Sequence, residues 1–467
     1  MEEHDTRNFS NKTEAFFKNK LVIFLALMAT VLPMAACFVF ILNYGVDIIY
    51  WDEWEMVAMY SQERISFHDL WSYHNEHRIF FPRIIYFSVA YLTGFNSKTQ
   101  MFFSYAHILV AFFIFARYLK TVSEGGMYYF QLIVTSLVLF NLVQWENLLW
   151  GFQIGFFMCW FYSIVTLYFF HLLINNNNIK NLTLTIIFGF IASFSSMQGL
   201  LVWPAIIGLI IVYRIFSTAR LGVRNTIVFL CAGIGNIILY FLNFDYNHFN
   251  RFVSSTKGYF LEQPLRFLGS AFRLVGCALA GPKLFGTSSN SDLYLVFGFY
   301  VLLILLVLTL LIAKKKISFD TKYVFCVGLI FYGVLFIGLI SIGRANHVAS
   351  RYMTFIYLLS IGLTLLICNI YKYKKNGVLT GFIIILIIAV LIGNIQAVIT
   401  AGNIRSEWQD MRYYLTNYTT VPDENLEMLF PSASFVRSLA PFLEENEFSV
   451  FRDNAITNFI SDVLTGR

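Results

Sequence analysis

Long apolar runs separated by short polar segments dominate this chain. A membrane-spanning helix takes roughly 20 consecutive apolar residues, and eleven runs reach or approach that length. The pattern therefore predicts an all-α polytopic membrane protein with about 11 transmembrane helices. The predicted spans are residues 20–43, 101–119, 127–144, 152–174, 181–196, 199–213, 222–243, 293–313, 323–342, 352–371 and 378–399.

One further apolar stretch, residues 79–94, allows two interpretations. It could form a short span, which would reverse the orientation of every later loop unless residues 181–213 formed a single long helix. We favour a helix that lies in the membrane interface, because Arg78, Pro82 and Arg83 suit the depth of lipid headgroups.

The composition excludes a soluble globular domain. Of the 467 residues, 58% are hydrophobic and 13% charged, and the mean hydropathy is +0.66. The net charge of +6 comes from Lys and Arg in short loops between spans, so it does not indicate nucleic-acid binding. The six cysteines are scattered through apolar runs without a CxxC spacing, which predicts neither a disulfide framework nor a metal site.

The positions of the basic residues predict the orientation of the chain. Cytoplasmic loops are enriched in Lys and Arg, and the basic loops all fall on one side if residues 1–19 are cytoplasmic. Residues 20–399 then form the transmembrane domain, whose first helix acts as an uncleaved signal anchor. The opposite side receives residues 44–100, 145–151, 197–198, 244–292, 343–351 and a small C-terminal tail, 400–467.

The first outer loop, residues 44–100, begins with an acidic pair. Asp52 and Glu53 are flanked by Trp51 and Trp54, a residue type that favours the membrane–water interface. A carboxylate here can act as a general base toward an acceptor hydroxyl, with its pKa adjusted by its neighbour and the low dielectric. The alternative is an acidic loop with interfacial tryptophans and no catalytic role, and this motif alone favours neither interpretation.

A second polar cluster follows in the same loop and contains His74, Glu76, His77 and Arg78, with Arg83 beyond it. Guanidinium groups at headgroup depth match the oxygens of a lipid phosphate. His74, Glu76 and His77 are also metal-ligand types, but their spacing matches no zinc signature. A structural or phosphate-contacting role is therefore favoured over a metal site.

Two shorter outer segments carry residues suited to a sugar. Trp145, Glu146 and Gln153 lie between two apolar runs. They fit an aromatic belt around a turn, or equally a sugar-binding surface of tryptophans, a carboxylate and an amide. Gln198 interrupts a long apolar stretch at the outer surface, where it is either a ligand contact or part of a turn.

The outer segment before the tenth predicted span is basic. It contains Arg344, His347, Arg351 and Tyr352. Positive charge on this side runs against the positive-inside preference and needs a physical reason. An anionic ligand at the outer leaflet supplies one, so this pattern favours a binding role.

These motifs together resemble the GT-C superfamily of integral-membrane glycosyltransferases. Trp51-Asp52-Glu53-Trp54 matches the acidic motif of that family, and His74-Asn75-Glu76-His77-Arg78 matches its downstream segment of a carboxylate and a cation. Ser350-Arg351-Tyr352 resembles a late outer-loop arginine motif. The similarity covers the architecture of residues 20–400. The Lys-Pro-Pro of the aminoarabinose branch is absent, with only Pro82 remaining, and the tail is too short for the large soluble domain of oligosaccharyltransferases.

The resemblance implies a GT-C-like bundle whose first extracytoplasmic loop carries juxtamembrane helices. It implies an inverting transferase that moves a sugar from a polyprenyl-phosphate donor to a glycan or glycolipid, with Asp52 as base and Glu53 as the alternative. The implied phosphate ligands are Arg78, Arg83, Arg344 and Arg351. The implied substrate contacts are Trp51, Trp54, His74, Glu76, His77, Trp145, Glu146, Gln153, Gln198, His347 and Tyr352.

No cofactor is required by this scheme, although a divalent cation at Asp52 and Glu53 remains open. Two other classes also stay open. A polysaccharide polymerase uses lipid-linked sugars on the same side, but depends on large mid-chain loops. A lipid-linked-sugar flippase predicts inverted repeats, which the chain lacks. The family resemblance and the short loops favour a bacterial inner membrane, with the tail periplasmic or extracellular.

Overall fold

A computed structural model describes residues 19–62, 64–216, 221–244, 264–280, short stretches between 294 and 306, 320–343, 348–371 and 377–452. Within these residues, nine helices are long and apolar enough to cross a membrane. The chain is therefore a multi-pass integral membrane protein. The nine are Lys20–Tyr44, Ser97–Val122, Gly125–Leu149, Gly151–Asn175, Met197–Phe216, Val223–Phe241, Thr321–Gly343, Ser350–Ile370 and Thr380–Thr416.

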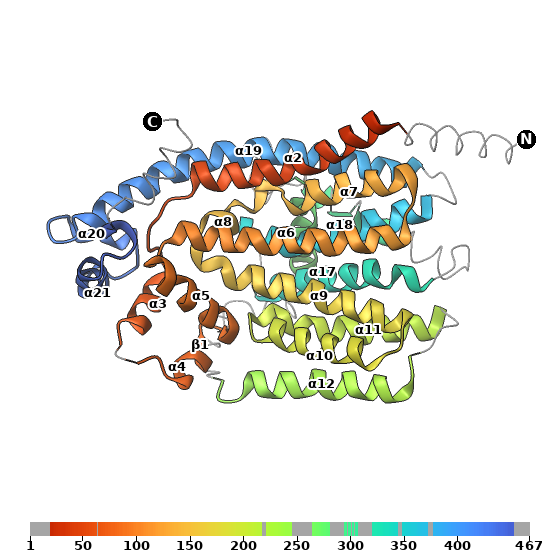
Figure 1. The fold of residues 1–467 in the computed structure, drawn as a ribbon, viewed down its shortest axis with the longest axis horizontal. Helices are drawn as coiled ribbons and strands as arrows, with labels where there is room; N and C mark the ends of the chain where they lie inside the picture. Colours follow the sequence, from red (N-terminus) through yellow and green to blue (C-terminus); the bar gives the residue numbers. More distant parts are fainter. Residues whose placement is uncertain are drawn as a thin grey trace, which may run out of the picture.

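The long helices run roughly side by side in one bundle, and the shorter helices of the first loop and the tail gather at one end of it (Figure 1). The bundle helices are α2 (Lys20–Tyr44), α6 (Ser97–Val122), α7 (Gly125–Leu139), α9 (Ile154–Asn175), α10 (Ile179–Ser193), α11 (Val202–Phe216), α12 (Val223–Phe241), α17 (Val324–Gly343), α18 (Met353–Tyr371) and α19 (Gly377–Thr416). A further helix, α15 (Pro264–Ala280), contacts α17, α18 and α19.

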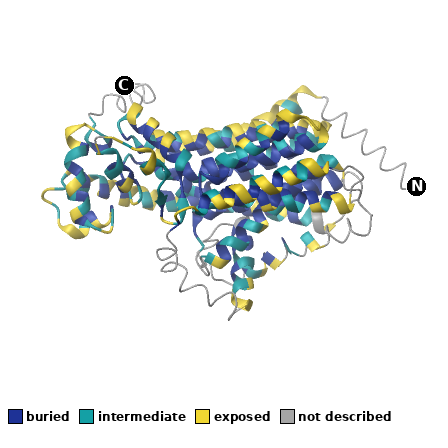
Figure 2. Cartoon of the chain, turned by 90° about the horizontal axis from the view of Figure 1, so that it is seen from below, coloured by how far each residue is buried: buried dark blue, intermediate teal, exposed yellow. Residues whose placement is uncertain are grey.

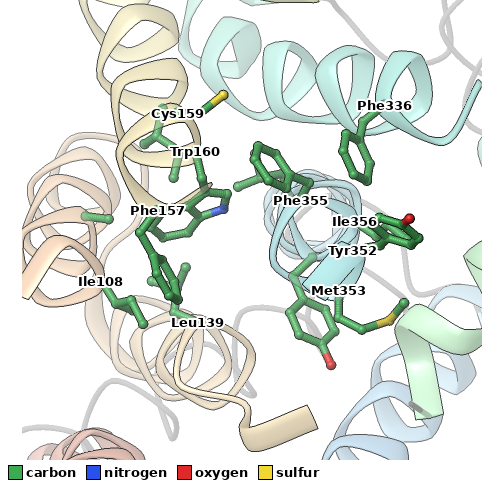
Figure 3. Packing of buried hydrophobic residues seen from close by; sticks show 14 of the residues in the cluster. Ile108, Leu139, Phe157, Cys159, Trp160, Phe336, Tyr352, Met353, Phe355 and Ile356 are labelled. Carbon is green, nitrogen blue, oxygen red and sulfur yellow. The ribbon is translucent and has the colours of Figure 1, made fainter. Parts of the chain in front are cut away.

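The core surrounds α18, whose most apolar window is completely buried, whereas only 17% of the corresponding window of α2 is buried. Aromatic rings fill the space between α18 and its neighbours α9 and α17 (Figure 3). Phe355 of α18 stacks on Phe336 of α17, with 4.7 Å between ring centroids. Exposed residues lie on the outside of the bundle (Figure 2). On α2 most of the exposed residues are apolar, as expected for a helix that faces lipid.

The predicted helix boundaries hold in most places. The predicted division of residues 181–213 into two helices is confirmed, because the 3₁₀ turn η3 (Met197–Leu201) separates α10 from α11. One boundary is wrong. The last predicted span, 378–399, is too short, since α19 continues unbroken to Thr416. At 40 residues, α19 is about 60 Å long, so it extends well beyond a hydrocarbon core of about 30 Å. The predicted span 293–313 falls mostly outside the described residues.

The first outer loop folds into short helices and a hairpin. They are α3 (Glu53–Tyr60), α4 (Phe67–Trp71), the two-residue strands β1 (Tyr73–His74) and β2 (His77–Arg78), and α5 (Phe80–Thr93). The hairpin pairs His74 with His77 in antiparallel register. Helix α5 covers the ambiguous stretch 79–94, and its 14 residues span only about 21 Å, too short to cross a bilayer.

The C-terminal tail packs on this first loop. After α19 it forms α20 (Asp423–Glu427), α21 (Ala433–Glu445) and the turn η7 (Ser449–Phe451). The amide of Trp51 donates a hydrogen bond to the carbonyl of Leu429 at 2.8 Å, and the amide of Ser449 donates one to Gly94 at 2.8 Å. The tail and the first loop thus lie at the same end of the bundle, as their shared predicted side requires (Figure 1).

The turn between α10 and α11 depends on Gly199, where a Cβ atom would lie 1.8 Å from the carbonyl oxygen of Ala192. Gly199→Ala therefore forces η3 away from the end of α10, and we expect a loss of roughly 2 kcal/mol or more in stability. The measurement is the melting temperature of the purified protein in detergent. Gly338→Ala is the control, because nothing lies within 4 Å of its added Cβ. Equal melting temperatures for the two variants would contradict the close approach.

Candidate functional site

A cavity of about 560 Å³ opens at the end of the bundle where the first loop and the tail pack. Its size falls in the range of small-molecule sites, which run from about 300 to 1,000 Å³. Segments that are far apart in the sequence, and that are predicted to face the outer side, line it together. Among the predicted site residues, the lining includes Trp51, Asp52, His74, Glu76, His77, Trp145, Glu146, Gln153, Gln198, Arg351 and Tyr352.

Aromatic rings form much of the cavity wall. Tyr50 is one of the lining residues, and its ring centroid is 5.5 Å from that of Trp150 and 5.5 Å from that of Trp408. Trp51 is 42% exposed and also lines the cavity. Flat rings of this kind pack against the C–H face of a sugar, while carboxylates and amides around them bind its hydroxyl groups. The cavity combines both kinds of surface.

The two adjacent carboxylates of the first loop point to different places. Asp52 precedes α3 and lines the cavity. Glu53 is fully buried away from the cavity and accepts hydrogen bonds from the amide of Tyr50 at 3.1 Å and the hydroxyls of Tyr86 and Ser97 at 3.3 and 3.2 Å. Burial raises the pKa of Glu53 to about 8, despite these hydrogen bonds. Asp52 is thus the carboxylate that can meet a substrate.

His74 lies between two carboxylates. Its Nδ1 is 2.9 Å from Glu55 Oε2, and its Nε2 is 3.6 Å from Asp52 Oδ2. Burial by itself lowers the pKa of His74, but the hydrogen bonds and charges of Asp52 and Glu55 outweigh burial and raise that pKa to about 9. The imidazole is therefore positively charged at neutral pH and keeps Asp52 next to a cation.

Arg78 and Arg83 are buried outside the large cavity, and backbone carbonyls occupy their guanidinium groups. Arg78 donates to the carbonyls of Trp71 and Leu242, both at 2.6 Å. Arg83 donates to the carbonyls of Asp69 at 2.9 Å and of Ser72. Each arginine ties elements of the fold together, and neither faces the cavity that holds Asp52.

Arg351 does face the cavity, and Glu146 holds it there. The Arg351 guanidinium forms an ion pair with the Glu146 carboxylate, and the Arg351 amide donates to Glu146 Oε2 at 3.2 Å. The Asn147 side chain donates to the Arg351 carbonyl at 2.8 Å. This contact joins α8 (Trp145–Leu149) to the turn η6 (Ser350–Tyr352), so the two outer segments are positioned as one unit.

The other predicted site residues lie at the cavity wall, in the core, or outside the described residues. His77 stands at the cavity wall with its Nδ1 3.4 Å from the amide of Met197, beside Gln198. Trp54 is completely buried in the core and does not line the cavity. Arg344 and His347 lie outside the described residues. No group of three or more His, Cys, Asp or Glu side chains is placed to hold a metal among the residues that the structure describes.

Sequence reasoning missed the contribution of α19. Ile404, Glu407, Trp408 and Met411 line the cavity from the part of α19 beyond its predicted end. Their spacing of three or four residues places them on one side of a helix. That spacing was the available signal, and the drop in hydropathy near residue 400 concealed it. Tyr50, Trp150 and Phe152 belong to the predicted motif segments but are not among the predicted site residues.

The buried Glu53 makes a prediction about pH. A carboxyl whose folded-state pKa lies near 8, above its unfolded value of about 4.3, stabilises the fold at low pH and loses that contribution as pH rises toward 8. We expect the melting temperature in detergent to fall between pH 5 and 8, and Glu53→Gln to flatten this slope. Glu424→Gln, at an exposed position, is the control. An unchanged slope in Glu53→Gln would contradict the burial argument.

Comparison with known proteins leaves the site to be interpreted from its own geometry. No protein-family model matches the chain, and no curated protein matches it. The aromatic and polar lining of the cavity and the separation of Asp52 from Glu53 are therefore the observations from which a function is argued.

Proposed function

We propose that the chain is a membrane glycosyltransferase that moves a sugar from a polyprenyl-phosphate donor to a glycan or glycolipid acceptor. The observation that carries the proposal is that one cavity holds a carboxylate, Asp52, an arginine, Arg351, and a wall of tryptophans. A base, a cation for the leaving phosphate and a sugar-binding surface are the three parts that such a transfer needs. The polymerase and flippase alternatives do not require the first-loop carboxylate.

Asp52 is the proposed general base. In an inverting transfer the acceptor oxygen bonds to the anomeric carbon while the bond from that carbon to the phosphate oxygen breaks. The electron pair leaves with the phosphate, and Asp52 takes the proton of the acceptor hydroxyl. His74 is a positioning residue in this scheme, because its contacts with Asp52 and Glu55 fix the orientation of the base.

Arg351 is the proposed partner of the leaving phosphate. One of its guanidinium nitrogens contacts Glu146, and the side chain also contacts Tyr352. A guanidinium carries five N–H donors, so these contacts leave donors of the fork for a second anion. The negative charge that develops on the departing phosphate would be stabilised by a cation held in advance in a partly enclosed site. Arg78 and Arg83 are left out of this role, because carbonyl groups already occupy them.

The finer architecture belongs to the same proposal. We propose a GT-C-like bundle of eleven spans in a bacterial inner membrane, with a cytoplasmic N-terminus and the first loop and tail on the outer side. Two features support it. Segments assigned to the outer side from the basic loops each contribute residues to the cavity, namely 44–100, 145–151, 197–198, 343–351 and the tail. Arg117 and Arg214 lie near the C-terminal ends of α6 and α11, and Lys180 lies at the start of α10, after the end of α9. Helix α9 and the turn before α11 contribute lining residues near their starts, so these basic residues lie away from the cavity.

The test is transfer activity in membranes supplied with radiolabelled polyprenyl-phosphate sugars. We expect Asp52→Asn to lower the rate by roughly 100-fold or more, because it removes the base while keeping the side-chain shape. Arg351→Ala should cause a comparable loss, because it removes the cation that faces the leaving group. Both variants must reach the membrane at normal levels for the comparison to count.

Asp410→Asn is the matched control, since this residue is exposed on α19 and does not line the cavity. It should transfer sugar at the wild-type rate. Undiminished transfer in Asp52→Asn would remove this residue as the base. Absence of transfer from the wild type across a panel of donors would place the polymerase and flippase alternatives ahead.

A further inference from the structure

A second, smaller cavity lies beside the first and has a different chemistry. It has a volume of about 180 Å³ and lies between the C-terminal end of α2, the start of α6 and α19. Its lining includes Asp47, Asn96, Lys98, Arg405, Gln409 and Arg412. It shares no lining residue with the large cavity, so it is a separate basic cleft.

The basic cleft carries an excess of positive charge. Three of its side chains, Lys98, Arg405 and Arg412, are cations, and one, Asp47, is an anion. Asp47 offsets part of this charge, because its carboxylate acts electrostatically on Arg412 and Lys98. Its Oδ1 accepts from the amide of Ser97 at 2.9 Å and its Oδ2 from the side chain of Asn96 at 3.0 Å. Within the part of the chain that the structure describes, none of the three cations has a hydrogen-bond or ion-pair partner.

Such an arrangement is unfavourable without a counter-charge. Like charges gathered in one partly enclosed cleft repel one another, and the cost grows as water is excluded. An anion with several oxygens would relieve the repulsion and accept the guanidinium donors of Arg405 and Arg412 in the paired geometry that phosphate favours. The cleft is therefore matched to a phosphate group.

The surface that leads to the cleft is apolar. Exposed aliphatic side chains follow one side of α19 in steps of three or four residues: Ile388, Leu391, Ile395 and Val398. The same steps continue through Gly402 to Arg405, Gln409 and Arg412, so the apolar stripe and the basic stripe form one helix face.

Helix α2 lies beside α19 and contacts it (Figure 1). It exposes apolar residues such as Leu32 and Val39. The residues that follow its C-terminal end line the cleft. Seven residues separate Val398 from Arg405, a rise of about 10 Å along α19. A lipid whose acyl chains lie along this apolar surface would bring its headgroup to the level of the arginines.

We propose that the basic cleft binds the phosphate of an anionic membrane phospholipid, with Arg405 and Arg412 as its principal ligands and Lys98 as a third. The acyl chains lie along the exposed faces of α2 and α19. This site does not depend on the transferase proposal, because it uses other residues and needs only that the bundle lies in a bilayer.

The experiment measures melting temperatures of the full chain in detergent during titration with dioctanoyl phosphatidylglycerol. A ligand that binds the folded state raises the melting temperature in a saturable way. We expect wild type to respond to phosphatidylglycerol and not to dioctanoyl phosphatidylcholine. The double variant Arg405→Gln/Arg412→Gln should need at least about tenfold more phosphatidylglycerol for the same rise, since each lost charge-assisted contact weakens binding.

Lys180→Gln/Arg224→Gln is the matched control, because it removes two exposed positive charges from α10 and α12 outside the cleft. It should respond as wild type does. Arg405→Lys/Arg412→Lys keeps the charge without the guanidinium fork. The phosphatidylglycerol concentration that it needs should lie between those needed by wild type and by Arg405→Gln/Arg412→Gln. Melting temperatures without lipid report whether each variant is folded, and Lys98→Gln supplies a second test of the cleft.

Three results would overturn the proposal. One is an absence of any response of wild type to phosphatidylglycerol. Another is an equal response of wild type and the double glutamine variant. The third is an equal stabilisation by inorganic phosphate at the same concentration, which would make the ligand a free anion and remove the lipid from the proposal.

Discussion

The buried guanidinium of Arg78 holds the first loop on the bundle. It donates to the carbonyls of Tyr240 at 3.1 Å and Leu242 at 2.6 Å, at the C-terminal end of α12, and to that of Trp71 in the loop. The last carbonyls of a helix lack partners within the helix and carry its negative partial charge. The cation and the helix end therefore satisfy one another, and removal of either would leave a buried polar group uncompensated. Because Arg78 is also in β2, this contact fixes the hairpin that carries His74.

A buried polar group needs hydrogen-bond partners, and this requirement also explains why Asp52 and Glu53 have different surroundings. Asp52 and Glu53 are adjacent at the start of α3, where successive side chains point in directions about 100° apart. The two carboxyls can therefore have different surroundings, and Glu53 faces inward between Tyr86 of α5 and Ser97 of α6. Its contacts set the orientation of α3 and leave Asp52 at the cavity. The acidic pair is thus one anchor and one candidate base, rather than two equivalent carboxylates.

The sequence predicts the large features because they follow from hydropathy and charge. Apolar runs locate the bundle helices, and several segments that the basic loops assign to one side line one cavity. Roles of single residues follow from direction and burial, which residue type does not reveal. Arg78, Arg83 and Arg351 look alike in sequence, yet only Arg351 reaches the large cavity. The end of α19 was misplaced for a related reason: its hydropathy falls near residue 400 while its helical spacing continues through Trp408.

Helix α19 relates the two cavities. Ile404, Trp408 and Met411 line the large cavity, while Arg405, Gln409 and Arg412 line the basic cleft one residue further round the helix. A rotation of this helix about its axis would therefore change both surfaces together. Packing alone leaves the outer side of α19 uncovered, since its apolar window is only 33% buried. A phospholipid bound at the cleft would supply the missing contacts on that side and fix the rotation that presents Trp408 to the large cavity. The lipid-facing surface and the candidate transferase site are, on this argument, two faces of one structural element.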